Sequence, residues 1–401
     1  MTRRCSNGIA VSHAPIPARR ATYVGIIASV LLVVLATGLP GCAIPPIPSD
    51  GDVTDGNVGV QGKPTGEPND AFSLALEAVF DAFGTAHLQG TVSVVGDMDT
   101  FEIGPLAAGD ALTVDAGTPG SNLDVAVAIF DAQQKLVFYN DDRGGSGTGA
   151  LDAFLEWTVR HDSDTYYLVV SHSGFAPQNR FTGSYRVDVR IGSPEPVPAP
   201  VGQILLLDFD GADIDSSALG QLTLDRFDAA DISPIYQGQT DIIKETIRST
   251  FEQNFERFDV TITTTDDPPL PSGTEYSVIY FGGFSNEAYG IAEGVDAYNV
   301  DYCDDAIIFT ESFVPEYFSV NPTAVEMGVA IGNIGSHEAG HLLGLNHVDD
   351  DRALMDDASA ADAFLDDQEF MVAPLSLDLM PIGVQDAVLL LEETVGPFTG
   401  P

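Results

Sequence analysis

Three histidines and a glutamate late in the chain have the types and spacing of a metal site. They lie in the segment 336–347, which reads SHEAGHLLGLNH. On a helix, His337 and His341 project from one face, because they are four residues apart, and can bind a single tetrahedral ion. Gly344 follows one turn later, where a residue that tolerates positive φ can end the helix and bring His347 back as a third ligand. Three histidines predict one catalytic Zn²⁺ with a fourth position left for water.

Glu338 is the predicted general base of this site. A carboxylate beside a zinc-bound water can accept its proton. The short pattern HExxH occurs by chance on amphipathic helices. The longer pattern HExxHxxGxxH is far rarer: among chains with this histidine content, about one in 10^5 is expected to contain it by chance. The pattern therefore favours a hydrolytic zinc site.

The segment 1–42 is predicted to be an export signal. Basic residues precede an apolar stretch at 24–39, and the segment ends in LPGC. This ending resembles the bacterial lipobox, in which the cysteine is lipidated, so Cys42 is the predicted lipidation site. The protein is expected outside the cytoplasm, lipid-anchored in the bacterial cell envelope or alternatively secreted.

Charge and cysteine content limit the partners. The chain has 60 acidic against 16 basic residues, so it repels nucleic acid and anionic lipid headgroups. No nucleic-acid partner is expected, and membrane contact is expected only through the lipid anchor. With Cys5 in the leader and Cys42 lipidated, Cys303 is expected to stay single, and no intrachain disulfide is expected. The sequence does not determine an oligomeric state.

Two folded regions separated by linkers are predicted, which makes the chain a multidomain protein. Residues 43–66 form a flexible linker and residues 193–202 a Pro-rich one. Between them, 67–192 alternate short apolar runs with turn residues, as in an all-β sandwich. Residues 203–396 mix strands and helices and predict an α+β domain with a twisted mixed sheet, an active-site helix and a C-terminal helix.

Sequence patterns predict two helices in the second region. Residues 241–255 carry an apolar residue at every fourth position from Ile243 to Phe255, which predicts a core-facing stripe. The helix with the histidines is expected to begin after Thr323, because Thr323 and Glu326 fit a capping box. Its several glycines lower its helix propensity, so it is expected to pack closely, most simply against the sheet.

The first region resembles the bacterial pre-peptidase C-terminal domain. The resemblance rests on EPND at 67–70, GDMDTF at 96–101 and TGSY at 182–185, among other short runs. In that family the domain is a β-sandwich companion of secreted peptidases. The resemblance therefore implies a sandwich that binds matrix or substrate, or aids export.

Ca²⁺ is the second cofactor considered. Asp97, Asp99, Asp141 and Asp142 could hold it, since Ca²⁺ prefers carboxylate oxygens. Turn formation is the commoner role of aspartates in such positions. Calcium binding and turn formation are both possible interpretations of these aspartates.

The second region resembles the metzincin metalloendopeptidases. The order of elements over 203–396 and the run ALMD at 353–356 carry this resemblance. It implies that Met355, eight residues after His347 as in the matrixins, forms a Met-turn floor under the histidines rather than a ligand. It also implies a protein or peptide substrate bound along an edge strand, here 289–297.

Together these patterns predict an exported zinc-dependent endopeptidase that hydrolyses peptide bonds with a zinc-bound water and Glu338 as general base. Two alternatives stay open. One is a surface binding lipoprotein with a vestigial zinc site, and the other is a zinc amidase acting on cell-wall peptide. The intact histidines and Glu338 argue against a vestigial site.

Overall fold

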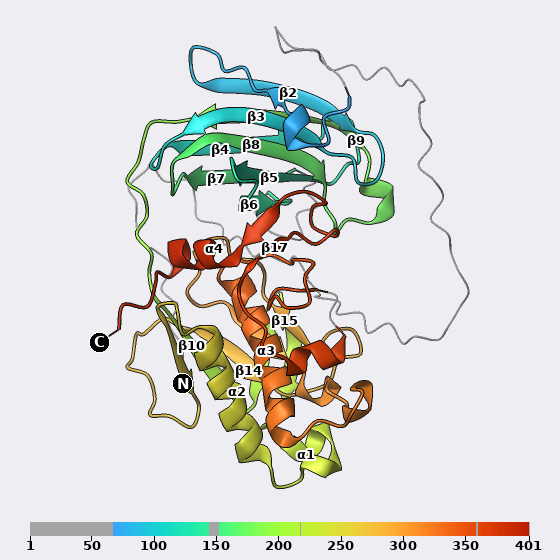
Figure 1. Ribbon diagram of the computed structural model, residues 1–401, viewed down its shortest axis with the longest axis vertical. Helices are drawn as coiled ribbons and strands as arrows, with labels where there is room; N and C mark the ends of the chain where they lie inside the picture. The colour runs from blue at the N-terminus through green and yellow to red at the C-terminus, as the bar shows by residue number, and fades with distance from the viewer. Residues whose placement is uncertain (1–66, 144–151, 217, 358–359, 401) are drawn as a thin grey trace, which may run out of the picture.

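The computed structural model describes residues 67–143, 152–216, 218–357 and 360–400. In these ranges an all-β part precedes a part that mixes helices and strands (Figure 1). The predicted export signal, the first linker and Cys42 lie outside the described residues. None of the helices within these ranges has the length and apolar character needed to cross a bilayer.

Nine strands in two facing sheets form the β-sandwich. They are β1 (Leu76–Glu77), β2 (Thr85–Val92), β3 (Asp99–Leu106), β4 (Ala111–Gly117), β5 (Val125–Asp131), β6 (Leu136–Asn140), β7 (Phe154–Thr158), β8 (Ser163–His172) and β9 (Gly183–Ile191). One sheet has the order β1-β3-β8-β5-β6 and the other β2-β9-β4-β7. In β9, Tyr185, Val187 and Val189 are buried between the sheets while the intervening charged residues are exposed. This alternation is the reason that one face of each strand lies in the core.

The second part is built on a mixed sheet. Its strands are β10 (Gln203–Asp208), β13 (Val260–Thr264), β14 (Ser277–Phe281), β15 (Gly290–Ala292) and β16 (Asp305–Ile308). They have the order β13-β10-β14-β16-β15, and only β15, at the edge, runs antiparallel to its neighbour. The hairpin of β11 (Ala212–Ser216) and β12 (Gly220–Leu224) covers one face through contacts with Ile307. Helices cover the other face.

The helices are α1 (Ala229–Ile232), α2 (Thr240–Asn254), α3 (Ala324–Leu342) and α4 (Ala387–Thr394). The capping box at the start of α3 is confirmed, because Glu326 N donates to Thr323 Oγ1 at 3.3 Å and Thr323 N donates to Glu326 Oε2 at 2.7 Å. Short 3-10 helices lie at Phe72–Leu74, Gln178–Arg180, Pro234–Tyr236, Thr310–Ser312, Pro315–Tyr317 and Ala361–Leu365.

Gly328 and Gly332 of α3 pack against α2 rather than against the sheet. A Cβ at Gly328 would lie 2.5 Å from Cβ of Thr246, and one at Gly332 would lie 2.6 Å from Cβ of Thr250. The expectation that the sheet explains these glycines is therefore incomplete. The absence of side chains lets two helix backbones approach closely and offsets the lost propensity.

The sandwich packs directly on the second part. The hairpin of β17 (Val372–Pro374) and β18 (Val384–Asp386) and the loop between them form this junction (Figure 1). Phe130 and Leu136 of the sandwich share an apolar cluster with Leu375 and Met380. Lys135 Nζ also lies 2.8 Å from Asp386 Oδ2. Apolar and charged contacts together hold the two parts against each other.

Cys303 forms a disulfide bond. The expectation that the chain has no intrachain bridge is therefore wrong. Cysteine number and position in the sequence do not reveal which thiols meet. Oxidising surroundings outside the cytoplasm permit such a bond.

Candidate metal centre

The three predicted histidine ligands converge at one point. Their Nε2 atoms are 3.1 Å apart for His337 and His341, 3.1 Å for His341 and His347, and 3.2 Å for His337 and His347. The first two lie on the last turns of α3. Gly344, at φ +93°, then turns the chain back toward His347. A Cβ at Gly344 would also lie 2.9 Å from Tyr298 N, so both conformation and space require glycine there.

The second ring nitrogens fix which atoms face the centre. His337 Nδ1 donates to the Leu354 carbonyl at 2.6 Å, and His341 Nδ1 donates to the Leu345 carbonyl at 2.8 Å. A carbonyl only accepts, so these Nδ1 atoms carry the protons and the Nε2 atoms present lone pairs. Burial lowers the pKa of His337 to about 4 and that of His341 to about 3, and it lowers the pKa of His347 well below its usual value. Neutral imidazoles are the form that binds a metal.

The spacing and chemistry of this donor set fit zinc. Tetrahedral Zn²⁺ bound to nitrogen at about 2.0–2.1 Å separates its ligand atoms by about 3.3 Å. The observed separations of 3.1–3.2 Å are close to that value. Lone pairs that face one another at this distance repel, and a cation between them removes the repulsion. Residues His337, His341 and His347 are therefore able to hold one zinc ion.

Glu338 lies buried beside the histidines, against the edge strand β15. Its side chain approaches so closely that a Cβ at Gly290 would lie 2.6 Å from Glu338 Oε1. Burial raises the pKa of Glu338 to about 8, and a hydrogen bond from the backbone of Ala292 opposes that rise. Oε2 is buried without a hydrogen-bond partner. An orphaned carboxylate oxygen at this position fits a site that receives water or another polar group.

Met355 lies in the core next to the histidine helix. A Cβ at Gly340 would lie 2.5 Å from Met355 Sδ, so the glycine makes room for the thioether. Met355 is 1 % exposed. Its carbonyl accepts from Val348 N at 2.9 Å, which ties the turn to the segment after His347. These contacts fit an apolar floor beneath the site.

The aspartates considered for Ca²⁺ lie in two separate places. Asp97 belongs to a group with Glu67 and Asp70 whose carboxylate oxygens lie within 4.8 Å of one another. Burial, followed by repulsion from Asp99 and Asp97, raises the pKa of Glu67 to about 7. Of these three residues only Asp97 was predicted from the sequence; Glu67 and Asp70 were not, although both lie in the run EPND. Asp141 and Asp142 lie elsewhere, in the cavity described next.

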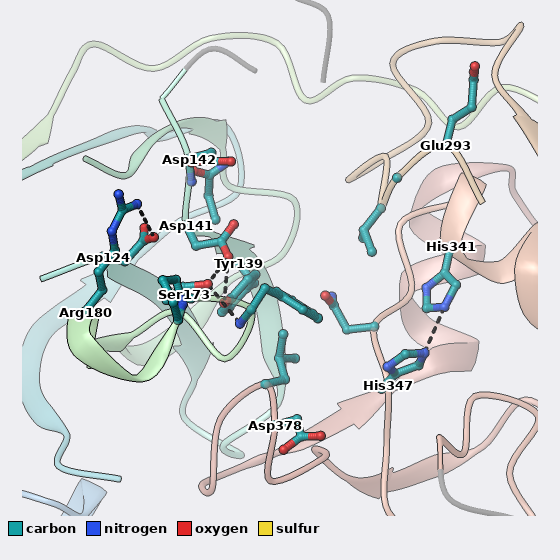
Figure 2. Close-up of a pocket in the computed structure, with 18 residues that line it drawn as sticks. Asp124, Tyr139, Asp141, Asp142, Ser173, Arg180, Glu293, His341, His347 and Asp378 are labelled. Atoms are coloured by element: carbon teal, nitrogen blue, oxygen red, sulfur yellow. Dashed lines mark hydrogen bonds and ion pairs between the residues drawn. The ribbon is translucent and has the colours of Figure 1, made fainter. Parts of the chain in front are cut away.

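A cavity of about 370 Å³ reaches the histidines and has walls from both parts of the protein. His341 and His347 line one side. Tyr139, Asp141 and Asp142 of the sandwich face them across the space (Figure 2). The sequence carried no signal for this arrangement, because it depends on how the two parts dock.

Comparison with known proteins gives only distant likenesses. No protein-family model and no curated protein matches the chain. Among solved structures, the periplasmic lysozyme inhibitor PliG of Aeromonas hydrophila is 17% identical and covers 29% of this chain and 96% of its own, with a TM-score of 0.23. The pre-peptidase C-terminal domain of a Bacillus anthracis collagenase is 14% identical and covers 31% of this chain and 100% of its own, with a TM-score of 0.22.

Archaemetzincin from Methanopyrus kandleri is 13% identical and covers 48% of this chain and 95% of its own, with a TM-score of 0.26. Identities and TM-scores of this size establish neither a family nor an activity for the chain. The functional conclusion therefore rests on the geometry of the site.

Proposed function

We propose that this protein is an exported zinc-dependent endopeptidase with a metzincin-like catalytic domain at 203–396. The observation that carries the proposal is the convergence of three histidine Nε2 atoms within 3.1–3.2 Å, with the Glu338 carboxylate on the same helix. The donor set leaves a coordination position for water, which is the mark of a catalytic rather than a structural zinc site.

Each residue at the site has a distinct role in this proposal. His337, His341 and His347 hold the metal as neutral ligands. Bound zinc would acidify a water molecule and polarise the substrate carbonyl. Glu338 accepts the proton of the attacking water through Oε2, while the backbone of Ala292 hydrogen-bonds the carboxylate and orients it. Glu338 then passes that proton to the leaving nitrogen as the peptide bond breaks.

The edge strand β15 supplies a place for an extended substrate. It pairs with β16 on one side, and an edge strand can pair with a peptide through backbone hydrogen bonds on its other side. Gly290 and Ala292 of this strand lie against Glu338. A peptide laid along β15 would therefore run past the general base.

Export and anchoring belong to the same proposal. Segment 1–42 directs the chain out of the cytoplasm, Cys42 carries the lipid, and 43–66 links the anchor to the sandwich at 67–192. Residues 193–202 join the sandwich to the catalytic domain. The cell envelope is then the place where the peptidase meets its protein or peptide substrate.

Replacement of Glu338 by Gln tests the proposal. The wild-type protein is expected to contain one zinc per chain, to cleave denatured casein, and to lose that activity with a chelator. The Glu338→Gln variant is expected to keep its zinc and lose turnover, because the amide cannot accept a proton. Casein cleavage by the variant at the wild-type rate would disprove the role of Glu338.

A further inference from the structure

We propose that the sandwich forms one wall of the substrate cleft, and that this wall selects peptides with a cationic side chain, Lys or Arg, near the scissile bond. This inference rests on the peptidase function proposed above and names the substrate class of the same site. Three properties of the cavity wall support it: its position opposite the histidines, its negative charge and its close packing on the second part.

The wall stands opposite the candidate zinc ligands. The cavity of about 370 Å³ is bounded by His341 and His347 on one side and by the end of β6 and the segment 173–180 on the other. Figure 2 shows Tyr139, Asp141 and Asp142 of the sandwich across this space from His341 and His347. A cavity of this volume is large enough to bind a side chain or a small ligand. A substrate held at the histidines would thus also contact the sandwich.

The wall is acidic and only partly neutralised. Among the described residues, Asp124, Asp141 and Asp142 of the sandwich and Asp378 of the loop between β17 and β18 line the cavity. The one guanidinium among these lining residues is that of Arg180, whose Nη1 lies 3.7 Å from Asp124 Oδ2. Burial, then repulsion from Asp141 and Asp142, raises the pKa of Asp124 to about 6. The remaining negative charge favours a positively charged ligand.

Glu293 also lines the cavity, but its carboxylate is engaged in hydrogen bonds within its own part of the protein. Its carboxylate accepts from Ser216 Oγ and, at 3.1 Å, from Asp305 N. Figure 2 shows it directed away from the histidines. The acidic character of the cavity therefore comes mainly from the aspartates of the sandwich and from Asp378.

The spacing of these carboxylates favours an organic cation over a metal ion. In the part of the chain that the structure describes, only two groups of three ligands have atoms within 4.8 Å of one another, namely the histidine triad and Glu67–Asp70–Asp97. The cavity aspartates form no such group. Charges spread along a wall suit the long side chain of Lys or Arg, which carries its charge away from the peptide backbone.

The wall is held in place by close packing of backbone on backbone. A Cβ at Gly174 would lie 1.5 Å from the carbonyl oxygen of Asp378, so the sandwich turn meets the other part without room for a side chain. Ser173 Oγ donates to Asp141 Oδ2 at 2.6 Å, which holds that carboxylate against the sandwich turn. The acidic wall is therefore a fixed part of the cleft.

A peptide library that varies charge tests this inference. The zinc-loaded mature protein is given matched peptides with Lys, Arg, Ala or Glu at each position around one scissile bond. We expect kcat/KM for the best cationic peptide to exceed that of its Ala counterpart by about tenfold, the effect of two or three partly exposed ion pairs. We expect high salt to reduce this ratio, because salt screens such pairs.

The variant for this test is Asp124→Asn combined with Asp142→Asn, both in the sandwich wall, and Asp188→Asn is the matched control. Asp188 is an acidic residue of the sandwich outside the cavity, paired with His87. The double variant is expected to lower the Lys-to-Ala ratio to about twofold, whereas the control keeps the wild-type ratio. Each ratio is measured on one protein sample, so it does not depend on the folded fraction.

The outcomes separate the two proposals. Cleavage without preference for cationic peptides, or a ratio that the double variant leaves unchanged, overturns the inference and leaves the peptidase function standing. Zinc-loaded protein that cleaves no peptide in the library overturns the peptidase function, and the inference falls with it.

Discussion

His161 is expected to make the docking of the sandwich depend on pH. Its Nδ1 lies 2.8 Å from Glu393 Oε1 of α4, and its Nε2 lies 3.6 Å from Asp131 Oδ2. The neighbouring carboxylates of Asp131 and Glu393 raise the pKa of His161 to about 9, against a usual value of 6.5. The difference corresponds to about 3 kcal/mol, at about 1.4 kcal/mol per pH unit. Because the pKa is raised by folding, this stabilisation is complete below pH 6.5 and is lost as the pH rises through 9.

Urea unfolding of the wild-type protein and of His161→Gln measures this contribution. The fluorescence of Trp157, the single tryptophan, reports on the sandwich core. The difference in the free energy of unfolding between the two proteins is expected to shrink by about 3 kcal/mol from pH 6 to pH 10. Titrating groups that both proteins share contribute equally to the two free energies and cancel in the difference. Glu338, whose pKa burial raises to about 8, is one of them.

His87→Gln is the matched control for this prediction. His87 also pairs with an aspartate of the sandwich, Asp188, at 2.7 Å, but its side chain is 70% exposed. Solvent screens that pair, so the control is expected to follow the wild-type pH curve closely. A difference between wild type and His161→Gln that stays constant from pH 6 to pH 10 would refute the reasoning.

Three further substitutions test the packing around the site. Thr323→Ala removes the N-cap of α3 and should cost about 1 kcal/mol in urea unfolding. Gly332→Ala improves helix propensity but places a Cβ against Thr250, so the free energy of unfolding is expected to fall by about 1–2 kcal/mol. A rise in that free energy would show that α2 shifts to make room for the methyl group. Gly174→Ala should push the sandwich turn off the backbone of Asp378, seen as faster proteolytic cleavage between the two parts; an unchanged cleavage rate would contradict that contact.

The local features of the second part were predictable because they depend on short-range spacing. The four-residue separation of His337 and His341 determines a shared helix face, and the Thr323–Glu326 pair determines where that helix begins. The apolar stripe of α2 follows the same rule, since Ile243, Ile247 and Phe251 are all buried. Each of these patterns repeats with the helix period and needs no knowledge of distant residues.

Features that depend on distant contacts were not predictable. Nothing in the sequence places Asp141 of the sandwich near His347, because their approach depends on the docking of two separately patterned regions. The packing of Gly332 on Thr250 likewise depends on the arrangement of two helices. The disulfide of Cys303 was missed for a different reason, since cysteine counts do not reveal which thiols meet.

Titration of the metal-free protein with Zn²⁺, while cleavage of a denatured protein is followed, tests the central claim most directly. The rate should rise with added zinc and level off at one equivalent per chain, because His337, His341 and His347 form one site. The Glu338→Gln variant should bind the same equivalent and stay inactive. Binding of one zinc by the wild-type protein with no cleavage, or cleavage that does not depend on zinc, would contradict the claim.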